Sequence, residues 1–202
     1  MNEKIKIKII LGSTRNARFG ERPATWINDE LKEMAEVDTE LIDLRDYPMP
    51  FFDSVTSPMS MKMDYPDKIV QKWSAKINDG DAFIIVTPEY NHGYPGVLKN
   101  AMDWIFPEWV KKPVGFVGYG SVGGARVIEQ LREVVIDLKM VPIYRSINLN
   151  WEFIMKAQSN KDIPNSELFA PLRNGNGADH LAVFIEDLLW MARALKSARE
   201  KG

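Results

Sequence analysis

Segments with the pattern of β-strands alternate five times along the chain with segments that have the pattern of α-helices. Apolar residues are continuous or alternating over residues 5–11, 40–44, 81–87, 114–117 and 141–148, which we predict to be strands. The intervening patterns predict helices over 20–35, 68–78, 96–105, 124–138 and 178–201. This alternation is typical of an α/β fold with one parallel sheet and helices on both faces. With five strands and right-handed connections, it favours the strand order 2-1-3-4-5.

Two segments are longer than a minimal domain of this kind needs. Residues 43–66 are predicted to be irregular and are rich in Pro, Met and Phe, and residues 151–177 form another extended stretch. Loops of this length in a compact domain are usually lids, binding loops or oligomer contacts. We expect Phe51 and Phe52 to pack in the core or at an interface rather than to take part in chemistry.

The composition narrows the classes of function. A length of 202 residues suits one domain spanning 1–202, and the net charge of −2 gives no reason to expect a nucleic acid or an anionic membrane as partner. No apolar run approaches the roughly 20 residues that cross a bilayer, and no secretory signal is evident, so a cytoplasmic protein is expected. The chain has no cysteine and only two isolated histidines, His92 and His180, so we predict no metal site. Redox chemistry would therefore need an organic cofactor.

The first loop of interest follows the first predicted strand and enters a helix. It contains Ser13, Thr14, Arg15, Arg18, Phe19 and Gly20. Hydroxyl groups and free backbone N–H groups at the positive end of a helix suit a phosphate, and the two arginines add charge to meet a dianion. The alternative is an ordinary helix cap with solvated charges. The position directly after the first strand favours the phosphate site.

The second loop follows the third predicted strand. Pro88, Glu89, Tyr90 and Asn91 lie in a stretch with two prolines and two glycines, which fix an unusual backbone path. Such a path can direct backbone N–H and C=O groups at a planar heterocycle, and tyrosines offer walls for stacking. Most loops of this composition bind nothing, and His92 is expected to be solvated or to contact a substrate.

The third loop follows the fourth predicted strand and includes Gly118, Tyr119 and Gly120. It contains a literal G-x-G-x-x-G, the pattern of a dinucleotide-binding turn. That assignment is disfavoured, because the pattern is not on the first strand and no acidic residue ends the next strand, where Asn148 and Asn150 stand instead. We interpret the glycines as opening the backbone to a flat ring. Strands 1, 3 and 4 are neighbours in the expected order, so all three loops should meet at one mononucleotide-sized site.

Three stretches together resemble the NADPH-dependent FMN reductase family, which includes azoreductase-, quinone reductase- and chromate reductase-like enzymes. They are residues 12–15 (GSTR), 87–104 (TPEYNHGYPGVLKNAMDW) and 112–126 (KPVGFVGYGSVGGAR). The resemblance implies a flavodoxin-like three-layer sandwich and FMN as cofactor. It places the FMN phosphate in residues 13–20, the isoalloxazine ring against 88–91 and the pyrimidine end of that ring at 118–120.

The resemblance also implies an activity. NADPH or NADH as co-substrate would reduce the flavin, which then reduces a small acceptor such as a quinone, an azo or nitro compound or a metal oxyanion, in ping-pong order. No side chain is predicted to be a catalytic acid or base. Family members are homodimers or homotetramers, and the tryptophans of residues 98–109 are candidates for that interface or for the core. Two alternatives stay open: an electron carrier without its own substrate, and a flavin-free dehydrogenase.

Overall fold

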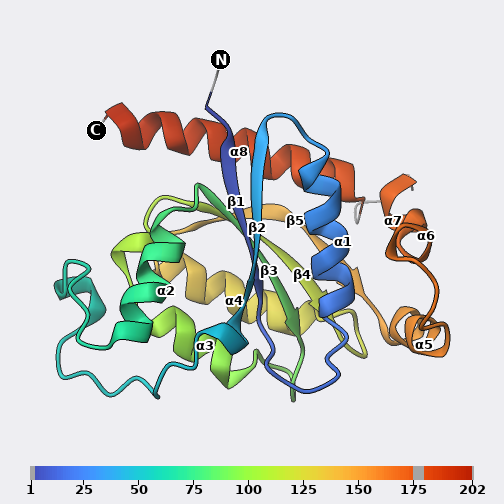
Figure 1. The fold of residues 1–202 in the computed structure, drawn as a ribbon, viewed down its shortest axis with the longest axis horizontal. Helices are drawn as coiled ribbons and strands as arrows, with labels where there is room; N and C mark the ends of the chain where they lie inside the picture. Colours follow the sequence, from blue (N-terminus) through green and yellow to red (C-terminus); the bar gives the residue numbers. More distant parts are fainter. Residues whose placement is uncertain (1–2, 175–179, 202) are drawn as a thin grey trace.

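The computed structural model describes residues 3–174 and 180–201 (Figure 1). Its centre is a parallel sheet in the order β2-β1-β3-β4-β5, which confirms the predicted architecture. Every pairing between neighbouring strands is parallel, so the carboxyl ends of all five strands lie at one edge. The strands are β1 (Ile5–Leu11), β2 (Val37–Asp43), β3 (Ala82–Pro88), β4 (Pro113–Tyr119) and β5 (Val141–Leu149).

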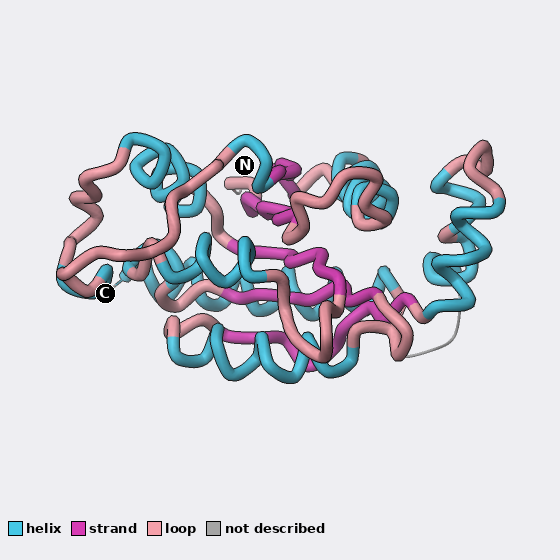
Figure 2. Tube along the Cα trace, turned by 90° about the horizontal axis from the view of Figure 1, so that it is seen from below, coloured by secondary structure: helices cyan, strands magenta, loops and turns pink. Residues whose placement is uncertain are grey.

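Helices cover both faces of the sheet, as Figures 1 and 2 show. One core cluster joins the sheet to α1 (Glu21–Lys32) and α8 (Leu181–Lys201). The other joins it to α2 (Lys68–Asn78), α3 (Gly96–Asp103) and α4 (Ala125–Asp137). The central strands β3 and β4 are buried along their whole length, as their apolar sequences require.

Several boundaries differ from the sequence prediction. Strand β2 begins at Val37 rather than at residue 40, because Val37–Thr39 pair with Ile5–Ile7 of β1. Helix α1 ends at Lys32, three residues before the predicted end, and α3 ends at Asp103. The predicted start of the last helix, Ala178, lies outside the described residues, and the described helix begins at Leu181.

The prediction of an extended stretch over residues 151–177 was wrong for the part that the structure describes. Three short helices form there: α5 (Trp151–Ser159), α6 (Asn165–Leu168) and α7 (Ala170–Asn174). Figures 1 and 2 show them beside α1 at one side of the sheet. The Asn150 side chain caps α5 by accepting a hydrogen bond from the Phe153 N–H (3.0 Å), so the helix begins directly after β5.

The aromatic residues of the 43–66 segment are partly exposed, whereas the two tryptophans that follow α3 are buried. Phe51 is 85% exposed, so of the two expected places, core and interface, the core is excluded, while Phe52 contacts the Trp104 ring edge-on at 5.1 Å. Trp104 and Trp109 are buried within the chain and belong to its core. The 43–66 segment holds only two single-turn 3-10 helices, Leu44–Asp46 and Pro58–Ser60.

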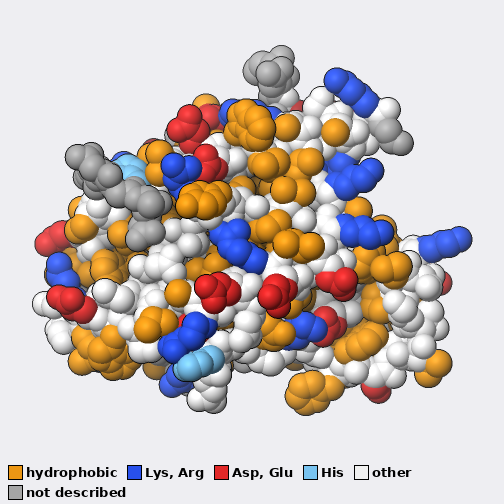
Figure 3. All heavy atoms as spheres, turned by 180° about the vertical axis from the view of Figure 1, so that it is seen from behind, with side chains coloured by type: hydrophobic (Ala, Val, Ile, Leu, Met, Phe, Trp, Pro, Cys, Tyr) orange, Lys and Arg blue, Asp and Glu red, His pale blue; other side chains and the backbone are white. Residues whose placement is uncertain are grey.

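The surface of the described residues shows neither a membrane segment nor a metal cluster. No described helix combines the length and the hydropathy that crossing a bilayer requires. Within residues 3–174 and 180–201, no group of three or more acidic, histidine or cysteine side chains could hold a metal ion. On the face shown in Figure 3, charged side chains of both signs are interspersed with apolar ones.

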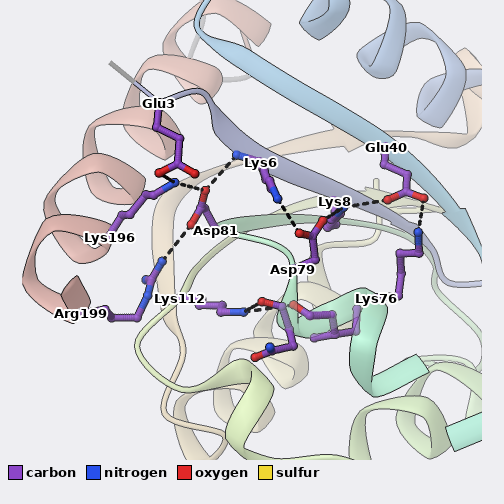
Figure 4. A network of polar contacts seen from close by, with 12 residues as sticks. Glu3, Lys6, Lys8, Glu40, Lys76, Asp79, Asp81, Lys112, Lys196 and Arg199 are labelled. Carbon is purple, nitrogen blue, oxygen red and sulfur yellow. Dashed lines mark hydrogen bonds and ion pairs between the residues drawn. The ribbon is translucent and has the colours of Figure 1, made fainter. Parts of the chain in front are cut away.

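A network of ion pairs joins elements at the amino-terminal edge of the sheet (Figure 4). Asp79 accepts from Lys6 (2.5 Å) and Lys8 (2.7 Å) of β1, and Asp81 pairs with Lys196 of α8 (2.9 Å). Lys112, whose pKa burial lowers to about 8, donates to two carbonyl oxygens at the end of α2. These contacts hold the edge opposite to the three predicted loops.

We expect this network to make stability depend on pH. Hydrogen bonds from Lys6 and Lys8 lower the pKa of Asp79 to about 2, so its stabilising contribution is complete above the unfolded pKa of roughly 4 and is lost as pH falls toward 2. Asp79→Asn should therefore lower the urea midpoint at about pH 5 and differ little from the wild type near pH 2. The matched control is Asp29→Asn, on the exposed surface of α1. A deficit of Asp79→Asn that does not change with pH would contradict this account.

Candidate functional site

The three predicted loops meet at the carboxyl edge of the sheet, the lower edge in Figure 1. A cavity of about 190 Å³ opens there between the loops that follow β1, β3 and β4 and helix α5. Eight of the thirteen predicted site residues line it: Arg15, Arg18, Phe19, Pro88, Glu89, Tyr90, Tyr119 and Gly120.

The loop after β1 places Arg15 and Arg18 in different environments. Arg15 is exposed, with its guanidinium 5.7 Å from the centre of the Tyr90 ring, and it has no carboxylate partner among the described residues. Arg18 is buried, donates to the Ser13 carbonyl oxygen and pairs with Asp43 and with Glu21 (3.0 Å). Arg15 is therefore available to a bound anion, whereas the charge of Arg18 is already balanced within the chain.

The Arg18–Asp43 pair is electrostatically strong. Burial by itself would raise the pKa of the Asp43 carboxyl, but the hydrogen bond and charge of Arg18 outweigh it and lower that pKa. The pair joins the loop after β1 to the end of β2. Arg45 reinforces this join by donating to the carbonyl oxygens of Thr14 (3.4 Å) and Arg15. These contacts fix the predicted phosphate loop to the end of β2.

Helix α1 starts at this loop, and its cap residue is Gly20, which provides no side-chain cap. The Arg22 N–H donates to the Phe19 carbonyl oxygen (3.1 Å), Pro23 has no N–H, and Glu21 stands in the first turn. An anion bound at this end would meet the positive end of the helix dipole beside the exposed Arg15.

The loop after β3 turns sharply at its tip. Tyr90 and Gly93 exchange both backbone hydrogen bonds (2.9 and 3.0 Å), and Asn91 and His92 between them have φ of 50° and 71°. Two successive positive φ angles are the signature of a type I′ turn. The turn directs the Tyr90 hydroxyl to the Ser13 hydroxyl, 2.8 Å away, and so joins the first two loops. Asn91 itself is exposed at the tip.

Glu89 is held against the start of α4. Its carboxylate, 4% exposed, accepts from the backbone N–H (3.1 Å) and the Nε (2.7 Å) of Arg126. Arg126 also contacts His92 Nε2 at 2.7 Å. The carboxylate is thus already engaged, and this contact fixes the loop after β3 against the loop after β4.

The loop after β4 depends on glycines. Gly124 has φ of +70°, and a Cβ there would lie 2.6 Å from the Tyr119 nitrogen and 2.8 Å from the Gly118 backbone. The Asn148 amide donates to the Gly123 carbonyl oxygen (2.9 Å). Asn148, which stands where a dinucleotide-binding fold would have an acidic residue, thus supports the loop after β4. A Cβ at Gly20 would lie 2.6 Å from the Tyr119 hydroxyl, which shows how closely the first and third loops approach.

The structure places the remaining predicted residues beside the cavity rather than in its lining. Ser13 contacts Tyr90, and Gly118 lies beneath Gly123 and Gly124. Thr14 faces a second cavity of about 340 Å³, whose lining also includes residues from the 43–66 segment and α3: Leu44, Arg45, Tyr47, Pro48, Met49, Val97 and Asn100.

Sequence reasoning missed three residues of the first cavity, Trp151, Ile154 and Gln158, which come from α5. Ala17 also lines the cavity and lies within the predicted phosphate loop, residues 13–20. A signal for the α5 residues was present, because residues directly after β5 must begin at the same edge as the other loops. Asn150 is also a favourable helix cap before an apolar stretch.

Comparison with known proteins identifies the family. The family model of the NADPH-dependent FMN reductases matches residues 5–151, which cover all five strands and all three loops. The chain belongs to this family. It is 39% identical over 135 residues to an NAD(P)H-dependent FMN reductase of Schizosaccharomyces pombe, covering 67% of this chain and 68% of that protein. It is 32% identical over 144 residues to a quinone reductase of Escherichia coli, covering 68% of this chain and 73% of that protein.

Solved structures support the same fold. The flavoenzyme NAD(P)H:(acceptor) oxidoreductase FerB from Paracoccus denitrificans superposes with a TM-score of 0.57 at 20% identity, covering 98% of each chain. This likeness shows the flavodoxin-like fold. Family membership makes the chain an NAD(P)H-dependent oxidoreductase whose flavin is FMN, as the resemblance had implied. The start of α1 without a side-chain cap, an exposed arginine and a loop whose Tyr119 and Gly120 line the cavity fit the phosphate and the ring of that flavin.

Proposed function

We propose that the chain, as a single FMN-binding domain of residues 1–202, transfers electrons from NADPH or NADH to quinones or similar small acceptors, among them azo and nitro compounds and metal oxyanions. The observation that carries the proposal is the convergence of three loops from adjacent strands on one cavity. A single shared cavity means that the nicotinamide and the acceptor use the flavin in turn, which is ping-pong order.

The residues of the chain bind and orient in this proposal. Arg15 and the start of α1 would hold the phosphate, and the loops of residues 88–91 and 118–120, of which Pro88, Glu89, Tyr90, Tyr119 and Gly120 line the cavity, would hold the ring. FMN, when bound, supplies the redox chemistry: it accepts two electrons and delivers them to the acceptor. In the overall balance NADPH gives a hydride, a proton comes from solvent, and a quinone becomes a hydroquinone. Because the carboxylate of Glu89 and the guanidinium of Arg18 are already paired, we assign no side chain as a catalytic acid or base.

Cofactor identification and steady-state kinetics test the proposal together. The purified protein should release FMN rather than FAD on heating, because the sequence has one predicted phosphate loop, and its G-x-G-x-x-G pattern after β4 is not in the position that would hold an adenylate. NADPH oxidation should be measured over a panel of acceptors, with several fixed quinone concentrations. Parallel double-reciprocal plots are expected. Recovery of FAD would contradict the cofactor assignment, intersecting lines would contradict the shared site, and FMN binding without any acceptor reduction would favour an electron carrier.

Assembly and location stay predictions. A homodimer or homotetramer is supported by exposed apolar side chains in the 43–66 segment, including Phe51 (85% exposed), Val55 (104%) and Met59 (56%), since apolar patches of this kind often mark contacts between proteins. A cytoplasmic location follows only from the sequence arguments above.

A further inference from the structure

Helix α5 turns one face toward the cavity. Trp151, Ile154 and Gln158 all line it, and their spacing of three and four residues is that of a single helical stripe. The family model ends at residue 151, so its match includes Trp151 but neither the rest of α5 nor α6 and α7 after it. Ile154 and Gln158 therefore belong to a part of the cavity wall that lies beyond the matched range.

This wall is held firmly against α1. Arg22 of α1 donates to the carbonyl oxygens of Ala157 (3.1 Å) and Ile163 and to the Asn165 side chain (2.9 Å). The ring of Trp26, also on α1, stacks on Phe169 with centroids 4.5 Å apart and planes 7° apart. Figure 1 shows α5, α6 and α7 alongside α1 in the same arrangement. The position of the α5 stripe is therefore set before any ligand binds.

Trp151 lies at the mouth of the cavity and not at its floor. Its side chain is 56% exposed, whereas Tyr119, which lines the same cavity, is 6% exposed, and Pro88 is buried. An exposed indole beside a cavity offers a flat apolar surface for stacking, and Trp151 stacks on no other aromatic ring among the described residues. Gln158, on the same stripe, has an amide that can donate and accept hydrogen bonds.

We propose that Trp151 determines acceptor specificity by stacking on the planar ring of the electron acceptor, while the Gln158 amide hydrogen-bonds to a polar group at the edge of that ring. This inference rests on the proposed function, since it concerns the acceptor of the same site. Two observations favour the acceptor over the flavin as the ligand of Trp151. The three loops that the proposed function assigns to the flavin come from β1, β3 and β4 and not from α5, and the exposed position at the mouth suits a molecule that enters and leaves.

The test compares Trp151→Ala and Trp151→Phe with Trp190→Ala, a control that removes another exposed indole (66%, against 56% for Trp151) from α8, where it lines a separate cavity. Each FMN-loaded variant is assayed with a two-ring naphthoquinone and with ferricyanide, an inorganic acceptor that has no ring to stack. We expect Trp151→Ala to raise the KM for the naphthoquinone by about tenfold. The KM for ferricyanide and the Kd for FMN should stay unchanged. Trp151→Phe should retain most of the quinone affinity, and Trp190→Ala should behave as the wild type.

The possible outcomes distinguish a failure of this inference from a failure of the proposed function. An unchanged naphthoquinone KM in Trp151→Ala, or an equal rise for ferricyanide, would overturn the acceptor role. A weakened FMN affinity of the same size would overturn it too, because Trp151 would then contact the flavin. If the wild type neither binds FMN nor is reduced by NADPH, the proposed function itself fails.

Discussion

Replacing Gly124 by alanine should destabilise the protein by about 2–4 kcal/mol, because a methyl group at this position meets backbone and not a movable side chain. Its Cβ would lie 2.6 Å from the Tyr119 nitrogen and 2.8 Å from the Gly118 backbone, and the φ of +70° is itself unfavourable for alanine. The loop after β4 must therefore shift, and Tyr119 and Gly120 shift with it. Because both residues line the cavity, FMN affinity should fall together with stability.

Gly96→Ala is the matched control for this substitution. Gly96 is the first residue of α3, is exposed, has no atom within 4 Å of an added Cβ and lies next to the loop after β3. Its replacement should change the free energy of unfolding by no more than about 0.5 kcal/mol and leave FMN binding intact. Urea denaturation gives the first quantity and a flavin fluorescence titration the second. Equal stability of Gly124→Ala and the wild type would show that the loop does not need this backbone geometry.

Arg15→Ala should weaken FMN binding, whereas Arg18→Ala should lower the stability of the fold. Removing Arg15 takes away a charged donor that is exposed beside the start of α1, so the Kd for FMN should rise about tenfold to a hundredfold. The stability of the flavin-free protein should hardly change. Removing Arg18 leaves the Asp43 carboxylate without its buried partner, which should lower the free energy of unfolding by about 3 kcal/mol.

A second substitution separates charge from packing in the Arg18 variant. Adding Asp43→Asn to Arg18→Ala removes the uncompensated charge and should recover part of the lost stability. Flavin titrations and urea melts of all three variants measure both effects. If Arg15→Ala binds FMN as tightly as the wild type, Arg15 does not contact the phosphate. If Arg18→Ala keeps its stability and loses FMN affinity instead, then Arg18 binds the phosphate and its pairing with Asp43 does not stabilise the fold.

The parts of the fold that the sequence predicted depend on local periodicity. Alternating and continuous apolar runs located all five strands, and the geometry of parallel sheets then brought the three loops to one edge. The roles of the two arginines could not be predicted in this way. Which of Arg15 and Arg18 turns inward depends on Asp43, a residue 25 positions further along the chain than Arg18, at the end of a neighbouring strand.

The α5 wall was missed for a related reason. Its local signals, a capping asparagine and apolar residues at helical spacing, are present but short, and Pro164 interrupts the segment before α6. The position of the wall depends on Arg22, more than a hundred residues earlier in the chain. For Phe51 the sequence left the core and an interface open, because an apolar side chain does not reveal from sequence alone whether its own chain covers it.

The most direct test of the central claim is an anaerobic titration of the FMN-loaded protein with NADPH in the absence of any acceptor. If nicotinamide and acceptor use one cavity in turn, about one equivalent of NADPH should abolish the visible absorbance of oxidised flavin, and a later addition of quinone should restore it. The account is contradicted if NADPH leaves the flavin oxidised and is consumed only once an acceptor is present. It is also contradicted if the protein takes up no FMN at this site.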